Sequence, residues 1–162
     1  MAFIDKIKER AKADKKTIVL PESMDKRTYE AAEKILKEGI ANLIIIGTPE
    51  EIEKNGKGFD ISGATIVDPY NDPNKQKYID KFVELRGKKG VTPEVAKEQM
   101  EKDYMYYACL MCKCGDADGA VSGDLAGAQH HGAEADGEKR GAAAPPGADG
   151  HVRGLLRHGC GG

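Results

Sequence analysis

The sequence predicts an α/β fold, a three-layer sandwich in which helices cover both faces of a mainly parallel sheet. Short runs such as Asn42–Ile46 are apolar throughout instead of alternating, which is typical of strands buried on both faces. Longer segments with helical periodicity separate these runs. After a leading helix the order is β-α-β-α-β, then three helical stretches and a last strand, and parallel neighbours require crossovers of this kind.

The chain opens with an amphipathic helix, since apolar residues at 3, 4, 7 and 11 fall at helical spacing among lysines. Thr17–Leu20 is the first predicted strand, and Pro21 ends it. Asp25 is then placed to cap a second helix, and Gly39 to stop it.

Asn42–Ile46 is the second predicted strand and ends at Gly47. Thr48 then supplies a cap, followed by proline and two acids, so a third helix begins there. The third strand is predicted at 64–67, where Asp68 and Pro69 end it.

The segment 73–86 carries Tyr78, Phe82 and Leu85 on one helical face. Thr92 begins the next helix in the same way as Thr48. Residues 104–114 form a further helical stretch with Gly115 as its cap, and 117–121 is the fourth strand.

Ligands of parallel sheets bind beyond the carboxyl ends of the strands. Three loops are therefore candidates for a site: 21–27, 47–50 and 118–123.

Composition limits the classes of function. A net charge of -2 argues against a nucleic-acid partner. No apolar run approaches the ~18 residues of a membrane span, and the start of the chain lacks the features of a signal peptide. Three of the four cysteines lie within 109–114, a poor disulfide framework, so we expect a cytoplasmic protein.

The cysteines also raise a metal hypothesis. Cys109, Cys112 and Cys114 offer three thiolates with no fourth ligand nearby, which makes a poor zinc site, so we interpret them as buried free thiols and predict no metal. All four histidines follow residue 123, in a segment with ten glycines and eight alanines, and we assign them no role.

Several motifs, taken in order, resemble the phosphate acetyl/butyryltransferase family. They are Ile18-Val-Leu-Pro-Glu22, Asp25-x-Arg27-Thr28, Gly39 to Gly47, Asp60 to Pro69, Glu84-Leu-Arg86 with Lys89-Gly-Val-Thr92, and Gly115-Asp-Ala-Asp-Gly-x-Val-Ser-Gly123. Together they cover residues 1–123.

The resemblance implies transfer of an acetyl group between coenzyme A and inorganic phosphate. Acetyl-CoA and phosphate would be substrates, with no separate cofactor. The family fold is two α/β domains around a cleft, usually in a homodimer, and residues 1–123 would be the N-terminal part of the first domain. The family's catalytic serine, arginine and aspartate lie in a C-terminal region without a counterpart here, so we expect no catalytic residue and no turnover.

The resemblance also implies substrate- or coenzyme A-binding residues. Arg86 would lie near the phosphates of coenzyme A, although a solvated cation at a helix end is an equal alternative. Ser122 and Gly123 would form a turn in the active-site cleft, where the alternative is a plain turn. Arg27 would lie near the cleft mouth, where a salt bridge explains it equally well. From their residue types, we expect Pro21 and Glu22 to shape their loop, and Asp116 and Asp118 to cap backbone N–H groups around the turn, with a catalytic role as the alternative for these two aspartates.

Residues 124–162 no longer follow the family pattern. One explanation is a natural, disordered Ala/Gly-rich tail; the other, which we favour, is a reading-frame slip. Shifting Leu155–Gly159 by one nucleotide permits F-F-V-M, which resembles a family strand expected nearby.

The leading hypothesis is thus an inactive fragment of a phosphate acetyltransferase. A phosphate butyryltransferase, a small coenzyme A- or nucleotide-binding module with a flexible tail, and a scaffold without ligand remain alternatives.

Overall fold

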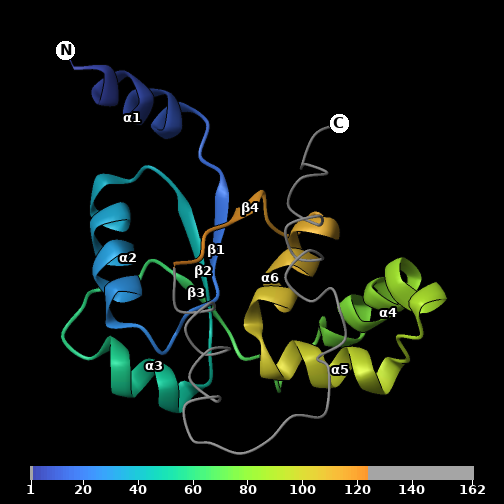
Figure 1. Ribbon diagram of the computed structural model, residues 1–162. Helices are drawn as coiled ribbons and strands as arrows, with labels where there is room; N and C mark the ends of the chain where they lie inside the picture. Colours follow the sequence, from blue (N-terminus) through green and yellow to red (C-terminus); the bar gives the residue numbers. More distant parts are fainter. Residues whose placement is uncertain (1, 124–162) are drawn as a thin grey trace, which may run out of the picture.

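A computed structural model describes residues 2–123. The predicted Ala/Gly/His-rich tail at 124–162 lies outside the described residues, so its boundary at 123 stays a prediction. The described elements follow the predicted order (Figure 1). They are α1 (Phe3–Ala13), β1 (Thr17–Leu20), α2 (Lys26–Glu38), β2 (Asn42–Ile46), α3 (Pro49–Gly56), β3 (Thr65–Val67), α4 (Lys75–Arg86), the 3-10 helix η1 (Gly87–Lys89), α5 (Pro93–Lys102), α6 (Tyr104–Lys113) and β4 (Gly119–Ala120).

The four strands form one sheet in the order β3-β2-β1-β4, and each neighbouring pair is parallel. In the register, Thr17 pairs with Asn42, Ile44 with Thr65, and Ile18 with Gly119. The predicted parallel sheet is confirmed. The fourth strand is shorter than the predicted 117–121, although the N–H of Asp118 still donates to the carbonyl of Thr17 and the N–H of Val121 to the carbonyl of Val19 on either side of it.

The sheet lies between two layers of helices, α2 and α3 on one face and α4, α5 and α6 on the other (Figure 1). Successive residues of the strands point to opposite faces of the sheet. Leu20, Leu43 and Ile45 pack with Tyr29 and Ala32 of α2. This confirms the predicted three-layer sandwich.

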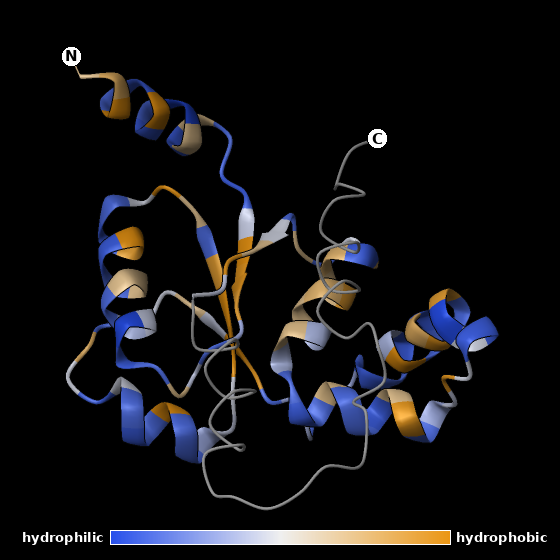
Figure 2. Cartoon of the chain, viewed as in Figure 1, coloured by the Kyte–Doolittle hydropathy of each residue, from blue (hydrophilic) through white to orange (hydrophobic). Residues whose placement is uncertain are grey.

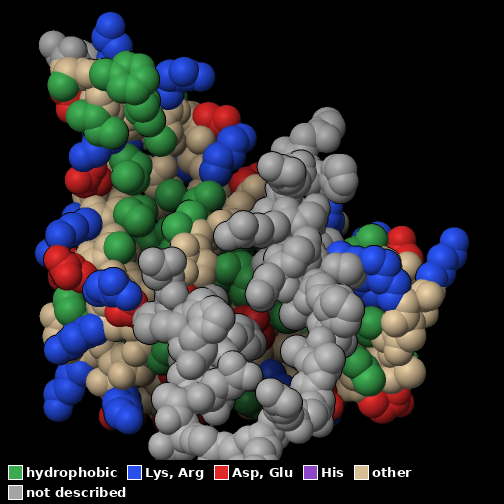
Figure 3. Space-filling view, in the orientation of Figure 1, with side chains coloured by type: hydrophobic (Ala, Val, Ile, Leu, Met, Phe, Trp, Pro, Cys, Tyr) green, Lys and Arg blue, Asp and Glu red, His purple; other side chains and the backbone are tan. Residues whose placement is uncertain are grey.

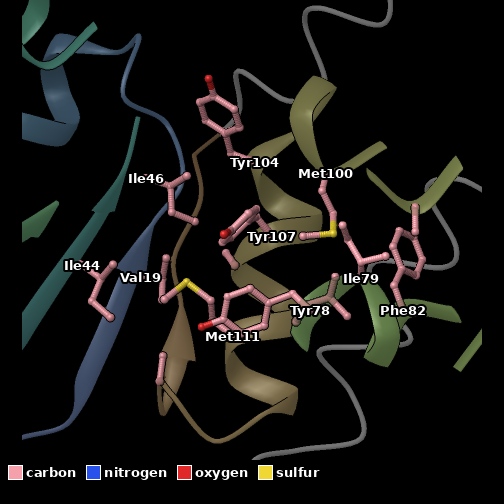
Figure 4. Close-up of a cluster of buried hydrophobic side chains, with 14 residues drawn as sticks. Val19, Ile44, Ile46, Tyr78, Ile79, Phe82, Met100, Tyr104, Tyr107 and Met111 are labelled. Atoms are coloured by element: carbon pink, nitrogen blue, oxygen red, sulfur yellow. The ribbon is translucent and has the colours of Figure 1, made fainter. Parts of the chain in front are cut away.

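The second face of the sheet carries the larger core cluster. Val19, Ile44 and Ile46 pack there against the aromatic and aliphatic side chains of α4, α5 and α6, among them Tyr78 and Tyr107 (Figure 4). β1 and β2 are accordingly the apolar centre of the molecule, whereas the helices expose polar surfaces (Figure 2). A strand that is apolar at every position is needed because both of its faces are covered.

The predicted helix boundaries follow from capping. Asp25 accepts from the N–H of Arg27, and Gly39 ends α2 in the left-handed conformation at φ 67°. Thr48 and Thr92 cap α3 and α5 through their side chains, each with proline in the first turn. These are the positions that the capping residues predicted.

α1 projects from the sandwich at the amino end of β1 (Figure 1) and buries none of its residues. Phe3 is 80% exposed, and Ile4 and Ile7 are exposed as well, so hydrophobic side chains gather on this helix in Figure 3. The predicted amphipathic helix is present. Within residues 2–123, no helix is long and apolar enough to cross a membrane.

Candidate functional site

The carboxyl ends of the parallel strands share one edge of the sheet, and the loops that leave them carry polar residues. Pro21–Asp25 follow β1, Gly47 and Thr48 follow β2, and Val121–Gly123 follow β4. The predicted loops 21–27 and 47–50 lie here, and so does the 121–123 part of the third loop, predicted at 118–123. Its first residue, Asp118, instead precedes β4 and lies at the opposite edge, where it accepts from the N–H of Thr17 at 2.8 Å.

A carboxylate joins the loops of two neighbouring strands at the carboxyl-end edge. The hydroxyl of Ser122 donates to Glu22 Oε1 at 2.8 Å, and the N–H of Gly123 donates to Glu22 Oε2 at 2.7 Å. A Cβ added to Gly123 would lie 3.2 Å from Oε2, so the turn closes tightly around the carboxylate. The predicted pair Ser122 and Gly123 is thus brought together, with Glu22 as its acceptor.

The next residue of the β1 loop, Ser23, is buried and held on several sides. Its hydroxyl donates to Glu51 Oε2 at 3.1 Å. Its carbonyl accepts from the hydroxyl of Tyr29 at 2.6 Å and from Asn55 Nδ2 at 3.1 Å. A Cβ on Gly47 would lie 2.5 Å from the Cβ of Ser23, so only glycine fits at the end of β2. The loop that carries Glu22 is therefore fixed at its next residue.

Glu51 links the two helical layers over this edge. It accepts from the N–H of Thr48 at 2.9 Å, closing the capping box of α3, and from the hydroxyl of Tyr104 in α6 at 3.2 Å. Burial and the charge of Glu51 raise the pKa of Tyr29 to about 12. The same two causes raise the pKa of Tyr104. Both tyrosines stay neutral donors at physiological pH.

Arg27, predicted near the cleft mouth, forms an ion pair with Asp25 in the first turn of α2. Its Nη2 lies 2.7 Å from Asp25 Oδ2, and its side chain is 72% exposed. The hydrogen bond from Arg27 lowers the pKa of Asp25. The salt bridge that was the alternative explanation for Arg27 is therefore present. It lies on the same edge of the sheet as Glu22.

Arg86 is the last residue of α4, immediately before η1. Figure 1 shows α4 running away from the sheet, so this end lies far from β4 and the Ser122–Gly123 turn. The structure does not bring the predicted arginine and the predicted turn together.

Asp116 has a different role from the predicted capping of backbone N–H groups. It accepts from Lys77 Nζ at 2.8 Å and from the hydroxyl of Tyr78 at 2.8 Å. Burial alone would raise the pKa of Asp116, but these hydrogen bonds lower it overall. The carboxylate therefore ties the start of α4 to the turn before β4. The capping role is correct only for Asp118.

The three described cysteines are free thiols. Cys109 is buried, and burial raises its pKa to about 11, whereas Cys112 and Cys114 are only partly buried. The interpretation as buried thiols is therefore right for Cys109 and too strong for the other two. Between residues 2 and 123, no group of three His, Cys, Asp or Glu side chains is placed to hold a metal ion.

Sequence reasoning missed the contacts of Glu22, Glu51 and Tyr104. Glu22 stood in a quoted motif and was expected only to shape its loop; its partners are about one hundred residues away in the chain. For Glu22, the one available signal was its position two residues after the buried strand Thr17–Leu20.

Comparison with known proteins identifies the family to which this chain belongs. The sequence profile described as Phosphate acetyl/butaryl transferase matches residues 2–135, most of the chain. The chain belongs to this family. Its match covers the Glu22 and Ser122–Gly123 loops and continues past Gly123.

Proteins similar to this chain carry the name of an enzyme of this family. Phosphate acetyltransferase from Thermoanaerobacterium thermosaccharolyticum is 50% identical over 125 residues, 77% of this chain and 38% of that protein. The enzyme of that name from Acetivibrio thermocellus is 46% identical over 123 residues, 76% of this chain and 37% of that protein. The chain thus spans 37–38% of the length of these two relatives.

A solved phosphotransacetylase from Streptococcus pyogenes has the same fold, with a TM-score of 0.68 and 32% identity over 77% of this chain and 39% of that one. EutD phosphotransacetylase from Staphylococcus aureus also gives 0.68, with 28% identity over 74% of this chain and 36% of that one.

Proposed function

We propose that this chain carries the N-terminal part of a phosphate acetyltransferase, which transfers an acetyl group reversibly between coenzyme A and inorganic phosphate. The observation that carries the proposal is the match, at up to 50% identity, with curated phosphate acetyltransferases across the whole described sandwich. The names of these relatives favour acetyl over butyryl transfer.

The reaction needs positioning and charge stabilisation more than a special cofactor. A phosphate oxygen attacks the thioester carbonyl, the C–O bond forms, the C–S bond breaks, and the thiolate of coenzyme A leaves. Phosphate must be held in line with the carbonyl, and its charge must be met by arginines and N–H or O–H donors. Ser122 and Gly123 supply such donors at the carboxyl-end edge, and Arg27 stands on the same edge.

In this proposal Arg86 binds a phosphate of coenzyme A at a point distant from the reacting thioester. Coenzyme A is long, and its pantetheine arm separates the thiol from the nucleotide phosphates. A phosphate contact at the end of α4 and a reacting group at the turn are therefore compatible with one ligand.

Residues 2–123 contain no group to which we assign the catalytic role, so binding is expected without turnover. We expect coenzyme A to bind the purified 162-residue chain with a dissociation constant of about 1 mM, worth about 4 kcal/mol. Arg86→Ala removes most of this affinity because it deletes the phosphate contact.

The matched control is Cys112→Ala, which leaves the affinity of the folded chain unchanged. Equal affinities of the wild-type chain and Arg86→Ala would remove Arg86 from the site.

The activity assay measures release of coenzyme A from acetyl-CoA and its dependence on phosphate. We expect none from the 162-residue chain. Clear phosphate-dependent release would contradict the assignment of the catalytic groups to parts of the family sequence that have no counterpart here.

A further inference from the structure

We infer that Ser122 and Gly123 form a binding position for a phosphate group and that the Glu22 carboxylate fills this position until the phosphate group replaces it. The inference rests on the proposed function and deepens it. Two donors from adjacent residues meet the two oxygens of one carboxylate at 2.8 and 2.7 Å. Two oxygens of a phosphate group can meet the same pair of donors, so the carboxylate occupies the place that such a ligand needs.

Hydrogen bonds, more than packing, hold this turn. The last backbone bond between β1 and β4 joins the N–H of Val121 to the carbonyl of Val19 at 3.0 Å. Val121 is 60% exposed, so it buries little apolar surface. Beyond it, the bonds to Glu22 continue the connection between the two strands. The donors are thus aimed by a contact that an anion can take over.

The exchange requires movement of a side chain alone. Ser23 is fully buried and fixed by Glu51, Tyr29 and Asn55, which anchors the backbone next to Glu22. Glu22 itself is only partly buried. Its carboxylate can therefore swing away from the turn while the loop keeps its shape.

Removing the charge of Glu22 should shift the exchange towards bound phosphate, and this shift can be measured. Glu22 both competes for the donors and repels a phosphate group, so neutralising it favours the phosphate. Gln has nearly the same size as Glu but is uncharged, and its hydrogen bonds are about half as strong as those of a carboxylate. Glu22→Gln therefore weakens the internal occupant with little change in packing.

The test is a titration of inorganic phosphate into the isotopically labelled 162-residue chain at constant ionic strength, followed by NMR at the amide of Gly123. We expect Glu22→Gln to bind phosphate about tenfold more tightly than the wild-type chain. Unchanged or weaker binding by Glu22→Gln would overturn the inference.

Two further variants separate the donor pair from general charge and from misfolding. Glu50→Gln makes the same charge change in the first turn of α3, on the same edge, and should change phosphate affinity less than twofold. Adding Ser122→Ala to Glu22→Gln should abolish the gain. An equal gain in Glu50→Gln, or a gain that survives Ser122→Ala, would contradict the inference. Native amide spectra establish that each variant is folded.

A parallel titration with coenzyme A distinguishes free phosphate from the phosphates of the larger ligand. A Gly123 response to inorganic phosphate, enhanced in Glu22→Gln and absent with coenzyme A, would support the inference and contradict the proposed coenzyme A site. Arg86-dependent binding of coenzyme A without any effect of Glu22→Gln on phosphate would do the reverse.

Discussion

Glu51 and Tyr104 join the two helical layers across the carboxyl-end edge of the sheet, with the Tyr104 hydroxyl 3.2 Å from Glu51 Oε2. The same carboxylate oxygen accepts from the buried hydroxyl of Ser23 and from the N–H of Thr48. One side chain in α3 thus fixes the loop after β1 and ties α3 to α6.

Glu51→Ala should destabilise the chain by about 2 kcal/mol, because it leaves the buried hydroxyl of Ser23 and the partly buried N–H of Thr48 without their acceptor. Urea unfolding measures the change. Glu50→Ala, an exposed acid in the same helical turn, is the matched control and should cost less than about 0.5 kcal/mol. Similar costs for the two variants would show that the contacts of Glu51 contribute nothing specific.

Gly47→Ala should destabilise by about 1–3 kcal/mol, because its Cβ would lie 2.5 Å from the Cβ of Ser23. The control is Gly119→Ala, whose Cβ would meet Ile18 Cδ1 at an ordinary 3.5 Å. We expect the control to cost less than about 1 kcal/mol. A Gly47→Ala protein as stable as the control would argue against the close approach of the two loops.

Asp118→Ala should lower the free energy of unfolding by about 1 kcal/mol, since it removes the acceptor of the Thr17 N–H. It should leave the coenzyme A affinity of the folded chain unchanged, because Asp118 lies at the amino-end edge. Loss of affinity without loss of stability would place Asp118 in the site and contradict its structural role.

The pKa of Tyr29, raised from 10.0 to about 12, predicts a dependence of stability on alkaline pH. Between these values the unfolded chain has lost this proton and the folded chain retains it. The contribution of Tyr29 is therefore fully present below pH 10 and is lost as the pH rises towards 12.

Tyr29→Phe should flatten the fall of unfolding free energy in this range by up to about 1.4 kcal/mol per pH unit. Chemical denaturation at several pH values measures the slope. Identical slopes for the two proteins would show that Tyr29 does not retain its proton on folding.

The elements were predictable where local chemistry decides them. β1 and β2 have the predicted bounds because Pro21 and Gly47 end apolar runs that both layers cover. The caps at Asp25, Thr48 and Thr92 act within three residues, so the sequence displays them directly.

The site was less predictable because its contacts join distant parts of the chain. Ser122 and Gly123 were predicted through the family resemblance, but their acceptor Glu22 is brought to them by the pairing of β1 with β4. Asp116 likewise meets Tyr78 only after α4 has packed in place. Such contacts depend on topology, which a local pattern does not contain.

The most direct test of the central claim is to map coenzyme A binding on the labelled 162-residue chain by amide chemical shifts. The account predicts changes at Ser122, Gly123 and the end of α4 around Arg86, and none at Thr17 or Asp118 on the opposite edge. Changes confined to the amino-end edge, or none at concentrations well above 1 mM, about the expected dissociation constant, would contradict the proposal that the carboxyl-end edge binds this ligand.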